Sequence, residues 1–139
     1  MMNLPFKGTG KIVYDPFRAG MKAKTDWWVV IEVDKEITRY YRWWLKTRYH
    51  LQLDAPAWDA HISVVRGEKP RADQQHLWKK YHGQTVEFQY GPDSFKSEQA
   101  DGRHFWIIDV VCPAVEMIRK ELERPYNWVP HLTIARERA

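Results

Sequence analysis

Two segments of the chain, 70 positions apart, carry the same order of residue types, and each begins with a histidine. Residues 61–66 read His-Ile-Ser-Val-Val-Arg, and residues 131–136 read His-Leu-Thr-Ile-Ala-Arg. Both follow the pattern histidine, aliphatic, hydroxyl, aliphatic, small apolar, arginine. Only these two of the six histidines share a local context. The pattern is typical of β-strands and indicates a short internal repeat.

The spacing within each segment places two reactive side chains on one side of a strand. Residues i and i+2 of a strand point the same way, so His61 should project with Ser63, and His131 with Thr133. One imidazole can remove a proton from an attacking oxygen while the other protonates a leaving oxygen, because both protonation states of histidine coexist near pH 6.5. The hydroxyls can donate to phosphoryl oxygens as charge builds there. We therefore expect a phosphodiester-cleaving site, with the acid and base roles interchangeable.

A metal site is the main competing interpretation of a histidine pair. It would need a third or fourth ligand, and no Asp, Glu, Cys or His stands at metal-binding spacing near either segment. We therefore expect neither a metal nor a cofactor. Arg66 and Arg136 lie five positions beyond each histidine, so in a regular strand they face away from it. A bulge would turn them back towards a bound phosphate.

Three further residues are candidates for substrate binding. Tyr14 could stack on a base, because the glycines at positions 8 and 10 would let backbone approach a ligand, and Lys11 could meet a phosphate. Trp128, held between two prolines just before the second motif, could form one wall of a substrate groove between the motifs. Core packing is an equal alternative for both rings. Cys112 precedes Pro113 at the end of an apolar strand, which favours an inert core thiol.

The elements that must position these residues alternate between strands and helices. Asp34 is a helix N-cap, apolar residues follow it at helical spacing, and Pro113 marks a second helix start. The pattern predicts an α/β or α+β fold in a single domain spanning residues 1–139. The expected strands are 11–14, 27–33, 60–66, 85–90, 95–96, 105–111 and 131–136, and the expected helices are 35–48, 73–81 and 113–124.

Bulk properties narrow the class of protein. The 139 residues are 44% hydrophobic, with a net charge of +4 and one cysteine. A single cysteine excludes an internal disulfide, and the N-terminus has no signal-peptide pattern, so we expect a cytoplasmic protein that does not act on membranes. The mild positive charge favours phosphate-bearing ligands but is too small for a dedicated duplex-DNA binder. Aromatic residues make up 14%, and some of these rings could stack on nucleobases.

The two motifs resemble the signature of the 2H phosphoesterase superfamily, two His-x-Ser/Thr motifs flanked by aliphatic residues. The resemblance implies a compact bilobal fold of two pseudo-symmetric βα lobes around a sheet-lined central groove. It also implies metal-independent chemistry on substrates with a 2′-hydroxyl or a 2′,3′-cyclic phosphate. Residues 61–70 look most like the small phage-encoded anti-CBASS nucleases, which degrade cyclic di- and trinucleotide signals in the host cytoplasm.

Two alternatives to a cyclic-oligonucleotide nuclease stay open. One is a 2H enzyme that acts on RNA ends, at a 2′,3′-cyclic phosphate or a 2′-5′ linkage. The other is a non-catalytic sponge that sequesters nucleotides with aromatic and basic residues. Matched histidines and hydroxyls favour an enzyme, because binding alone requires no proton-transfer pair. The oligomeric state, base preference and ring size of the substrate are not determined by the sequence.

Overall fold

The computed structural model describes residues 4–16, 25–58, 60–98 and 102–138, which form a mixed α+β fold built mostly of strands. In chain order the elements are β1 (Phe6–Tyr14), β2 (Trp28–Val33), α1 (Lys35–Tyr49), β3 (Leu53–Asp54), β4 (His61–Arg66), the 3-10 helix η1 (Ala72–Leu77), β5 (Thr85–Tyr90), β6 (Phe95–Glu98), β7 (His104–Val111), α2 (Pro113–Glu121) and β8 (His131–Glu137). No described helix is both long and apolar enough to cross a membrane.

Most local predictions match these elements. The Asp34 side chain accepts a hydrogen bond from the Glu36 amide at 2.9 Å, so it caps α1 as expected. Pro113 is the first residue of α2. Two differences stand out: β1 begins at Phe6, five residues before the expected strand, and the helix expected at 73–81 is only a short 3-10 helix. The loop expected near residues 99–102 lies mostly outside the described residues.

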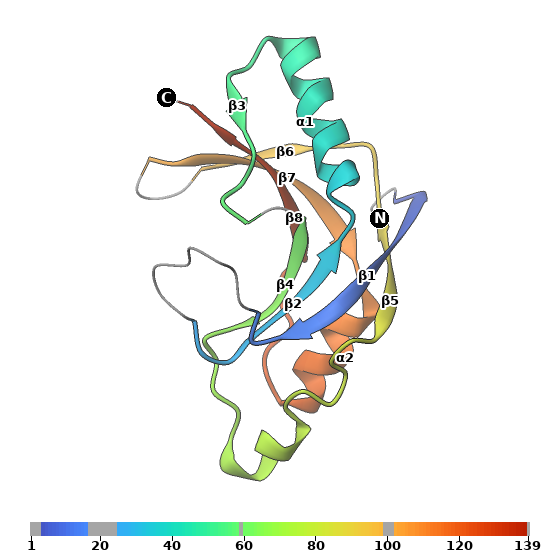
Figure 1. Cartoon of the computed structure of the whole chain (residues 1–139), viewed down its shortest axis with the longest axis vertical. Helices are drawn as coiled ribbons and strands as arrows, with labels where there is room; N and C mark the ends of the chain where they lie inside the picture. Colours follow the sequence, from blue (N-terminus) through green and yellow to red (C-terminus); the bar gives the residue numbers. More distant parts are fainter. Residues whose placement is uncertain (1–3, 17–24, 59, 99–101, 139) are drawn as a thin grey trace.

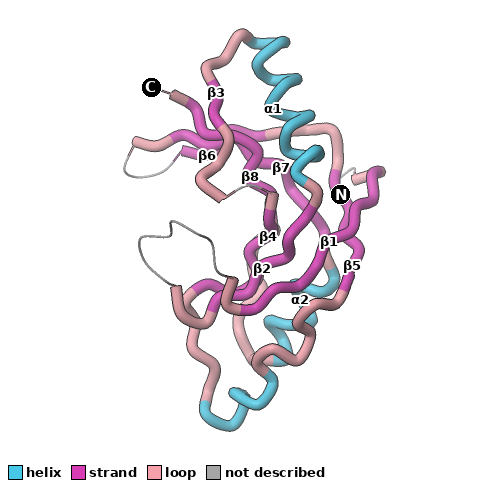
Figure 2. Tube along the Cα trace, viewed as in Figure 1, coloured by secondary structure: helices cyan, strands magenta, loops and turns pink. Residues whose placement is uncertain are grey.

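All strand pairs are antiparallel, and the sheet has the order β3-β8-β4-β2-β1-β5-β7-β6. Because β8 pairs with β7 as well as with β4, six strands close into a barrel. In Figure 1, α1 lies towards the upper end of the molecule and α2 towards the lower end, with β4 and β8 between them. Figure 2 shows the same predominance of strands over helices. The α+β expectation is confirmed, whereas the two-lobed arrangement stays a prediction.

One row of aliphatic side chains runs across five neighbouring strands. Its members pair in register from β1 through β2, β4 and β8 to β7, and each is fully buried: Ile12, Ile31, Ile62, Leu132 and Ile108. Strand neighbours alternate between the two faces of a sheet. The residues beside this row on each strand must therefore face the opposite side, away from the aliphatic core.

The two glycines of β1 make room for core side chains, not for a ligand. A Cβ atom at Gly8 would lie 2.5 Å from the Phe88 ring, and one at Gly10 would lie 2.5 Å from Cγ2 of Ile31 and 2.8 Å from the Glu32 carbonyl oxygen. This packing corrects the expectation that these glycines let the backbone approach a substrate.

Replacement of Gly10 by alanine tests this close packing. We expect Gly10→Ala to destabilise the fold by about 1–3 kcal/mol in urea denaturation, the usual cost of overpacking a core. Thr9→Ala, at the exposed neighbouring position, is the control and should stay within about 0.5 kcal/mol. Because alanine otherwise stabilises a strand relative to glycine, an unchanged or raised urea midpoint for Gly10→Ala would contradict the described approach of β1 to β2.

Candidate active site

The two histidine motifs meet through the antiparallel contact between β4 and β8. Ile62 pairs with Leu132, which places His61 across from Thr133 and Ser63 across from His131. Ile62 and Leu132 face the core, so these four side chains share the opposite face. The two histidines are diagonal neighbours, and such positions lie about 7–8 Å apart in an antiparallel pair. A phosphoryl group fits between two imidazoles at that separation.

Both motif strands carry a bulge at the same motif position. On β4 the register passes from Ser63 to Val65 and leaves out Val64; on β8 it passes from Thr133 to Ala135 and leaves out Ile134. Each skipped residue lies three positions after its histidine. A residue inserted in this way reverses the alternation of side chains beyond it.

The bulges decide where the motif arginines point. Arg66 pairs with Trp28, which shares a face with Val30, the partner of Ser63. By the same alternation, the register of β8 with β7 places Arg136 on the face of Thr133. Both arginines therefore lie on the histidine face, which corrects the regular-strand expectation and fits the bulged alternative.

Each histidine also has a carboxylate on the strand at its other side. Glu32 of β2 pairs with His61, and Asp109 of β7 pairs with His131. Each imidazole is thus flanked by a hydroxyl on one neighbouring strand and a carboxylate on the other. The sequence analysis missed both acids because they lie far from the motifs along the chain. The sequence does carry a signal for them: Glu32 is the only acid of β2 and Asp109 the only acid of β7, and apolar residues stand on both sides of each.

His131 is exposed at the start of β8. Solvent reaches its side chain, yet neighbouring protein atoms displace water and lower the pKa of the imidazole below its ordinary value of 6.5, while the Asp109 carboxylate acts to raise it. Because the net effect lowers the pKa of His131, its imidazole is mainly neutral at pH 7 and can accept a proton.

Aromatic rings connect His61 to Arg66. The Trp58 ring lies 5.2 Å from the His61 ring, and the Trp28 and Trp58 rings meet edge-on at 4.4 Å. The Arg66 guanidinium lies 5.4 Å from the Trp28 ring, at cation–π distance. These contacts restrict both motif side chains of β4 to one side of the strand.

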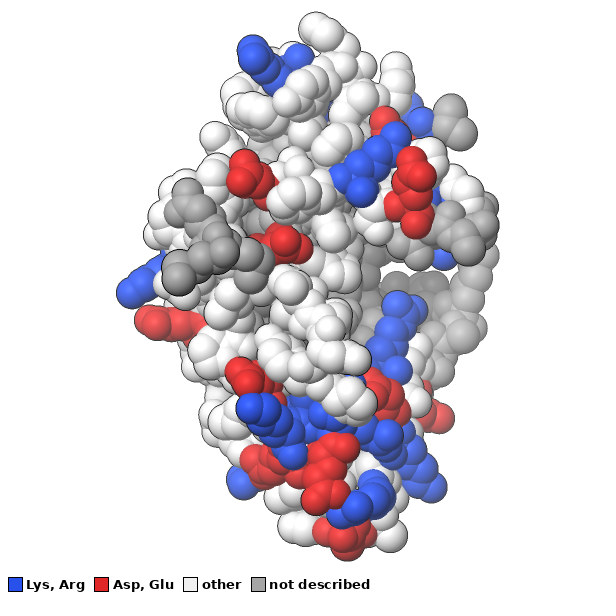
Figure 3. All heavy atoms as spheres, turned by 180° about the vertical axis from the view of Figure 1, so that it is seen from behind, with Lys and Arg blue, Asp and Glu red and all other residues white. Residues whose placement is uncertain are grey.

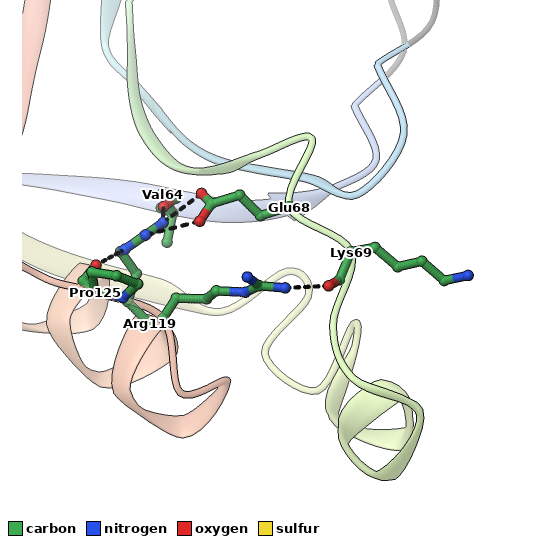
Figure 4. A network of polar contacts seen from close by, with 6 residues as sticks. Val64, Glu68, Lys69, Arg119 and Pro125 are labelled. Carbon is green, nitrogen blue, oxygen red and sulfur yellow. Dashed lines mark hydrogen bonds and ion pairs between the residues drawn. The ribbon is translucent and has the colours of Figure 1, made fainter.

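Arg119 of α2 joins the motif strand β4 to the segment that precedes β8 (Figure 4). It is only 5% exposed and donates to the carbonyl oxygens of Val64 at 2.9 Å and Pro125 at 2.6 Å. Its guanidinium forms two hydrogen bonds with the Glu68 carboxylate, at 2.8 and 3.0 Å, which lower the pKa of that carboxyl. It also lies 4.4 Å from the Trp128 ring. This buried cation therefore ties the bulge of β4 to the segment that leads into β8.

Two pockets flank the motif residues. The first, of about 470 Å³, is lined in part by Ser63, Arg66 and Trp128. The second, of about 330 Å³, is lined in part by Arg136 and Phe105, which pair across β8 and β7. Each pocket therefore combines a motif arginine with an aromatic ring. Trp128 is 38% exposed, which fits the predicted role of groove wall.

The other two substrate-binding candidates do not join the motif centre. Tyr14 is 4% exposed and packs edge-on against Trp78 at 5.1 Å, and burial raises its pKa to about 12. This burial corrects the expectation that Tyr14 stacks on a base. Lys11 pairs with Glu32 and so lies on the histidine face, but its Cε lies near Gly83, away from β2. The structure brings Lys11 to the correct face, though not to the histidines.

Within residues 4–16, 25–58, 60–98 and 102–138, no group of three or more His, Cys, Asp or Glu side chains is placed to hold a metal ion. Cys112 is buried, and this burial raises the pKa of its thiol, which disfavours a nucleophilic thiolate.

Comparisons with models of protein families, with curated proteins and with solved structures found no match for this chain.

Removal of the Arg119 guanidinium tests its linking role. Arg119→Met keeps an unbranched side chain but leaves Glu68 and two carbonyl oxygens without their donor, so we expect a loss of about 2–3 kcal/mol in urea denaturation. Arg124→Met is the matched control, because Arg124 makes a single exposed bond to the Lys69 carbonyl oxygen. It should cost well under about 1 kcal/mol. Equal stability of the two variants would show that Arg119 does not hold β4 to the segment that leads into β8.

Proposed function

We propose that this protein is a metal-independent phosphodiesterase of the 2H type that cleaves ribonucleotide phosphodiester bonds in cyclic oligonucleotides. The observation that carries the proposal is the cross-strand arrangement of His61, Ser63, His131 and Thr133 on one face. The matching bulges, which turn an arginine of each motif to the same face, give it independent support.

The chemistry needs one proton acceptor and one proton donor. His131 removes the proton from the substrate 2′-hydroxyl, whose oxygen attacks the adjacent phosphorus. The bond from phosphorus to the 5′-oxygen breaks, and His61 donates a proton to that oxygen. The ring opens to a linear oligonucleotide that ends in a 2′,3′-cyclic phosphate. Solvent then returns a proton to His61 and takes one from His131.

The roles of the two histidines follow from their surroundings. The desolvated imidazole of His131 favours its neutral form, which a general base requires. Asp109, across from His131, stabilises the imidazolium that forms when the proton is accepted. Ser63 and Thr133 donate to the non-bridging oxygens, where negative charge accumulates in the transition state.

The flanking pockets support a substrate with a nucleoside on either side of the reacting phosphate. Volumes of about 470 and 330 Å³ lie within the usual range of small-molecule sites. In each pocket the arginine suits a neighbouring phosphate, and the ring suits a base. In cyclic di- and trinucleotides, every phosphate has a nucleoside on both sides. Degradation of such signals in the host cytoplasm would serve a phage in counter-defence.

The order of elements along the chain supports a two-lobed arrangement. Each half contains two paired strands, a helix and a motif strand: β1, β2, α1 and β4 in the first half, and β5, β7, α2 and β8 in the second. We propose that these halves are the two pseudo-symmetric lobes, with the motif strands in contact at their junction.

Product analysis with histidine variants tests the reaction. Cyclic dinucleotides, cyclic trinucleotides and RNA bearing a 2′,3′-cyclic phosphate are incubated with the protein in excess EDTA, and the products are separated by chromatography. We expect ring-opened products, with turnover lowered at least 10²-fold by His61→Ala and by His131→Ala. The double variant should be little worse than either single variant, because the pair acts as a unit.

Three outcomes would contradict the proposed reaction. Near-normal turnover of either single variant would exclude the two-histidine mechanism. Products from the RNA end alone would replace the cyclic substrate with the RNA-end alternative. Tight binding without any product would leave the nucleotide sponge. His50→Ala, an exposed histidine at the end of α1, is the matched control and should keep full turnover.

The pH dependence of kcat/KM tests the assignment of the base. Because the pKa of His131 is lowered, activity should persist below pH 6.5 and fall only when the imidazole becomes protonated. Asp109 acts to raise that pKa, so Asp109→Asn should move the acidic limb to still lower pH while it slows turnover. Glu32→Gln, the equivalent change beside His61, should leave this limb in place. If the acidic side of the pH profile stayed in place in Asp109→Asn, or moved to higher pH, His131 would be excluded as the base.

A further inference from the structure

The helix α1 exposes aromatic rings that do not pack in the hydrophobic core. Thr38, Tyr41 and Leu45 form the buried side of this helix. Four rings of the helix are exposed by 38–59%: Tyr40, Trp43, Trp44 and Tyr49. The aliphatic side chains of α1 are buried or half-buried, so its exposed apolar surface consists only of rings.

The charge on α1 is mostly positive. The helix carries five cations, Lys35, Arg39, Arg42, Lys46 and Arg48, against a single carboxylate, Glu36, which pairs with Arg39 at 2.7 Å. Among the described residues, Lys35, Lys46 and Arg48 have no ion-pair partner.

The lower part of the molecule, around η1 and α2, is different. There, acidic and basic side chains are mixed (Figure 3). Several of them form ion pairs, such as Lys80 with Glu121 at 2.8 Å and Lys120 with Glu116 at 2.7 Å. The cationic surplus of α1 is therefore a local property of this helix.

The rings of α1 continue into a pocket at the start of the helix. A cavity of about 440 Å³ is lined by Phe6, Tyr40, Tyr41 and Tyr90, together with Glu36 and Ile37. Neighbouring rings touch along this line: Phe6–Tyr90 at 5.5 Å, Tyr41–Tyr90 at 6.5 Å, Tyr40–Tyr41 at 5.7 Å and Tyr40–Trp43 at 6.2 Å between centroids. The aromatic surface thus extends from β1 to the middle of α1.

We infer that this surface, Phe6, Tyr40, Trp43 and Lys46, is a second site that binds single-stranded nucleic acid. The rings offer stacking platforms for successive bases, and Lys46, three positions after Trp43 on the same side of α1, meets a phosphate between them. A membrane surface fits less well, because the exposed face carries no aliphatic side chain. A second copy of this chain would bring like charges together.

The site lies on the opposite side of the sheet from the histidines. The buried residues Tyr41 and Leu45 of α1 belong to the same core as Ile62 and Leu132. Those two side chains point away from the histidine face. The site is therefore independent of the proposed catalytic groove, and each can be tested without the other.

Fluorescence anisotropy of a labelled oligodeoxythymidylate of about 12 nucleotides tests the inference, since this length covers a typical single-strand site. The probe has no 2′-hydroxyl, so it cannot react by the proposed mechanism. We expect saturable binding at about 50 mM salt. The Kd should rise about 10- to 100-fold in a Tyr40→Ala/Trp43→Ala double variant, through loss of base stacking. Lys46→Gln should reduce the slope of log K against log salt by about 0.7.

Matched controls come from the other helix. Met117→Ala and Lys120→Gln remove an exposed apolar side chain and an exposed cation from α2, and they should leave both Kd and salt slope unchanged. The Tyr40→Ala/Trp43→Ala variant should keep the urea midpoint and any turnover of the wild type. No saturable binding, or binding indifferent to Tyr40 and Trp43, would overturn the inference. The inference would also be overturned by a dimer that forms in the wild type but not in the Tyr40→Ala/Trp43→Ala variant. Binding to anionic vesicles without binding to the probe would overturn it as well.

Discussion

The buried row formed by Ile12, Ile31, Ile62, Leu132 and Ile108 holds five strands in a single register. Truncation of one such fully buried aliphatic side chain to alanine typically costs about 2–5 kcal/mol, so the register is strongly specified. A shift of β4 or β8 by one residue would turn its histidine and hydroxyl into the core and expose its aliphatic residues. The chemistry on the histidine face therefore depends on aliphatic packing on the opposite face, which the helices α1 and α2 cover.

The two bulges add a second level of control to this register. A regular strand would place each motif arginine on the face opposite its histidine; the extra residue at Val64 and Ile134 brings both arginines to the same side as the imidazoles. Arg119 then holds the first bulge directly, through the carbonyl oxygen of Val64. A buried cation on α2 thereby contributes to the shape of the first pocket, which it also lines.

The sequence was sufficient for features that depend on neighbouring residues. The alternation in residues 61–66 and 131–136, the cap at Asp34 and the start of α2 at Pro113 were all predictable locally. Features that depend on partner strands were not. The bulges arise from pairing with β2 and β7, and the carboxylate beside each histidine comes from those same strands. Tyr14 could equally have been exposed, because short alternation does not show which face is buried.

The central claim is that His61 and His131 serve one phosphate, and nuclear magnetic resonance can test it without turnover. The ring nitrogen signals of all histidines are followed during titration with a cyclic dinucleotide whose 2′-hydroxyls are replaced by hydrogen, so that no nucleophile is present. Our account predicts that the His61 and His131 signals shift along a single binding curve with one Kd, while those of His50 and His76 stay in place. Movement of only one motif histidine, or two curves with different Kd values, would contradict it.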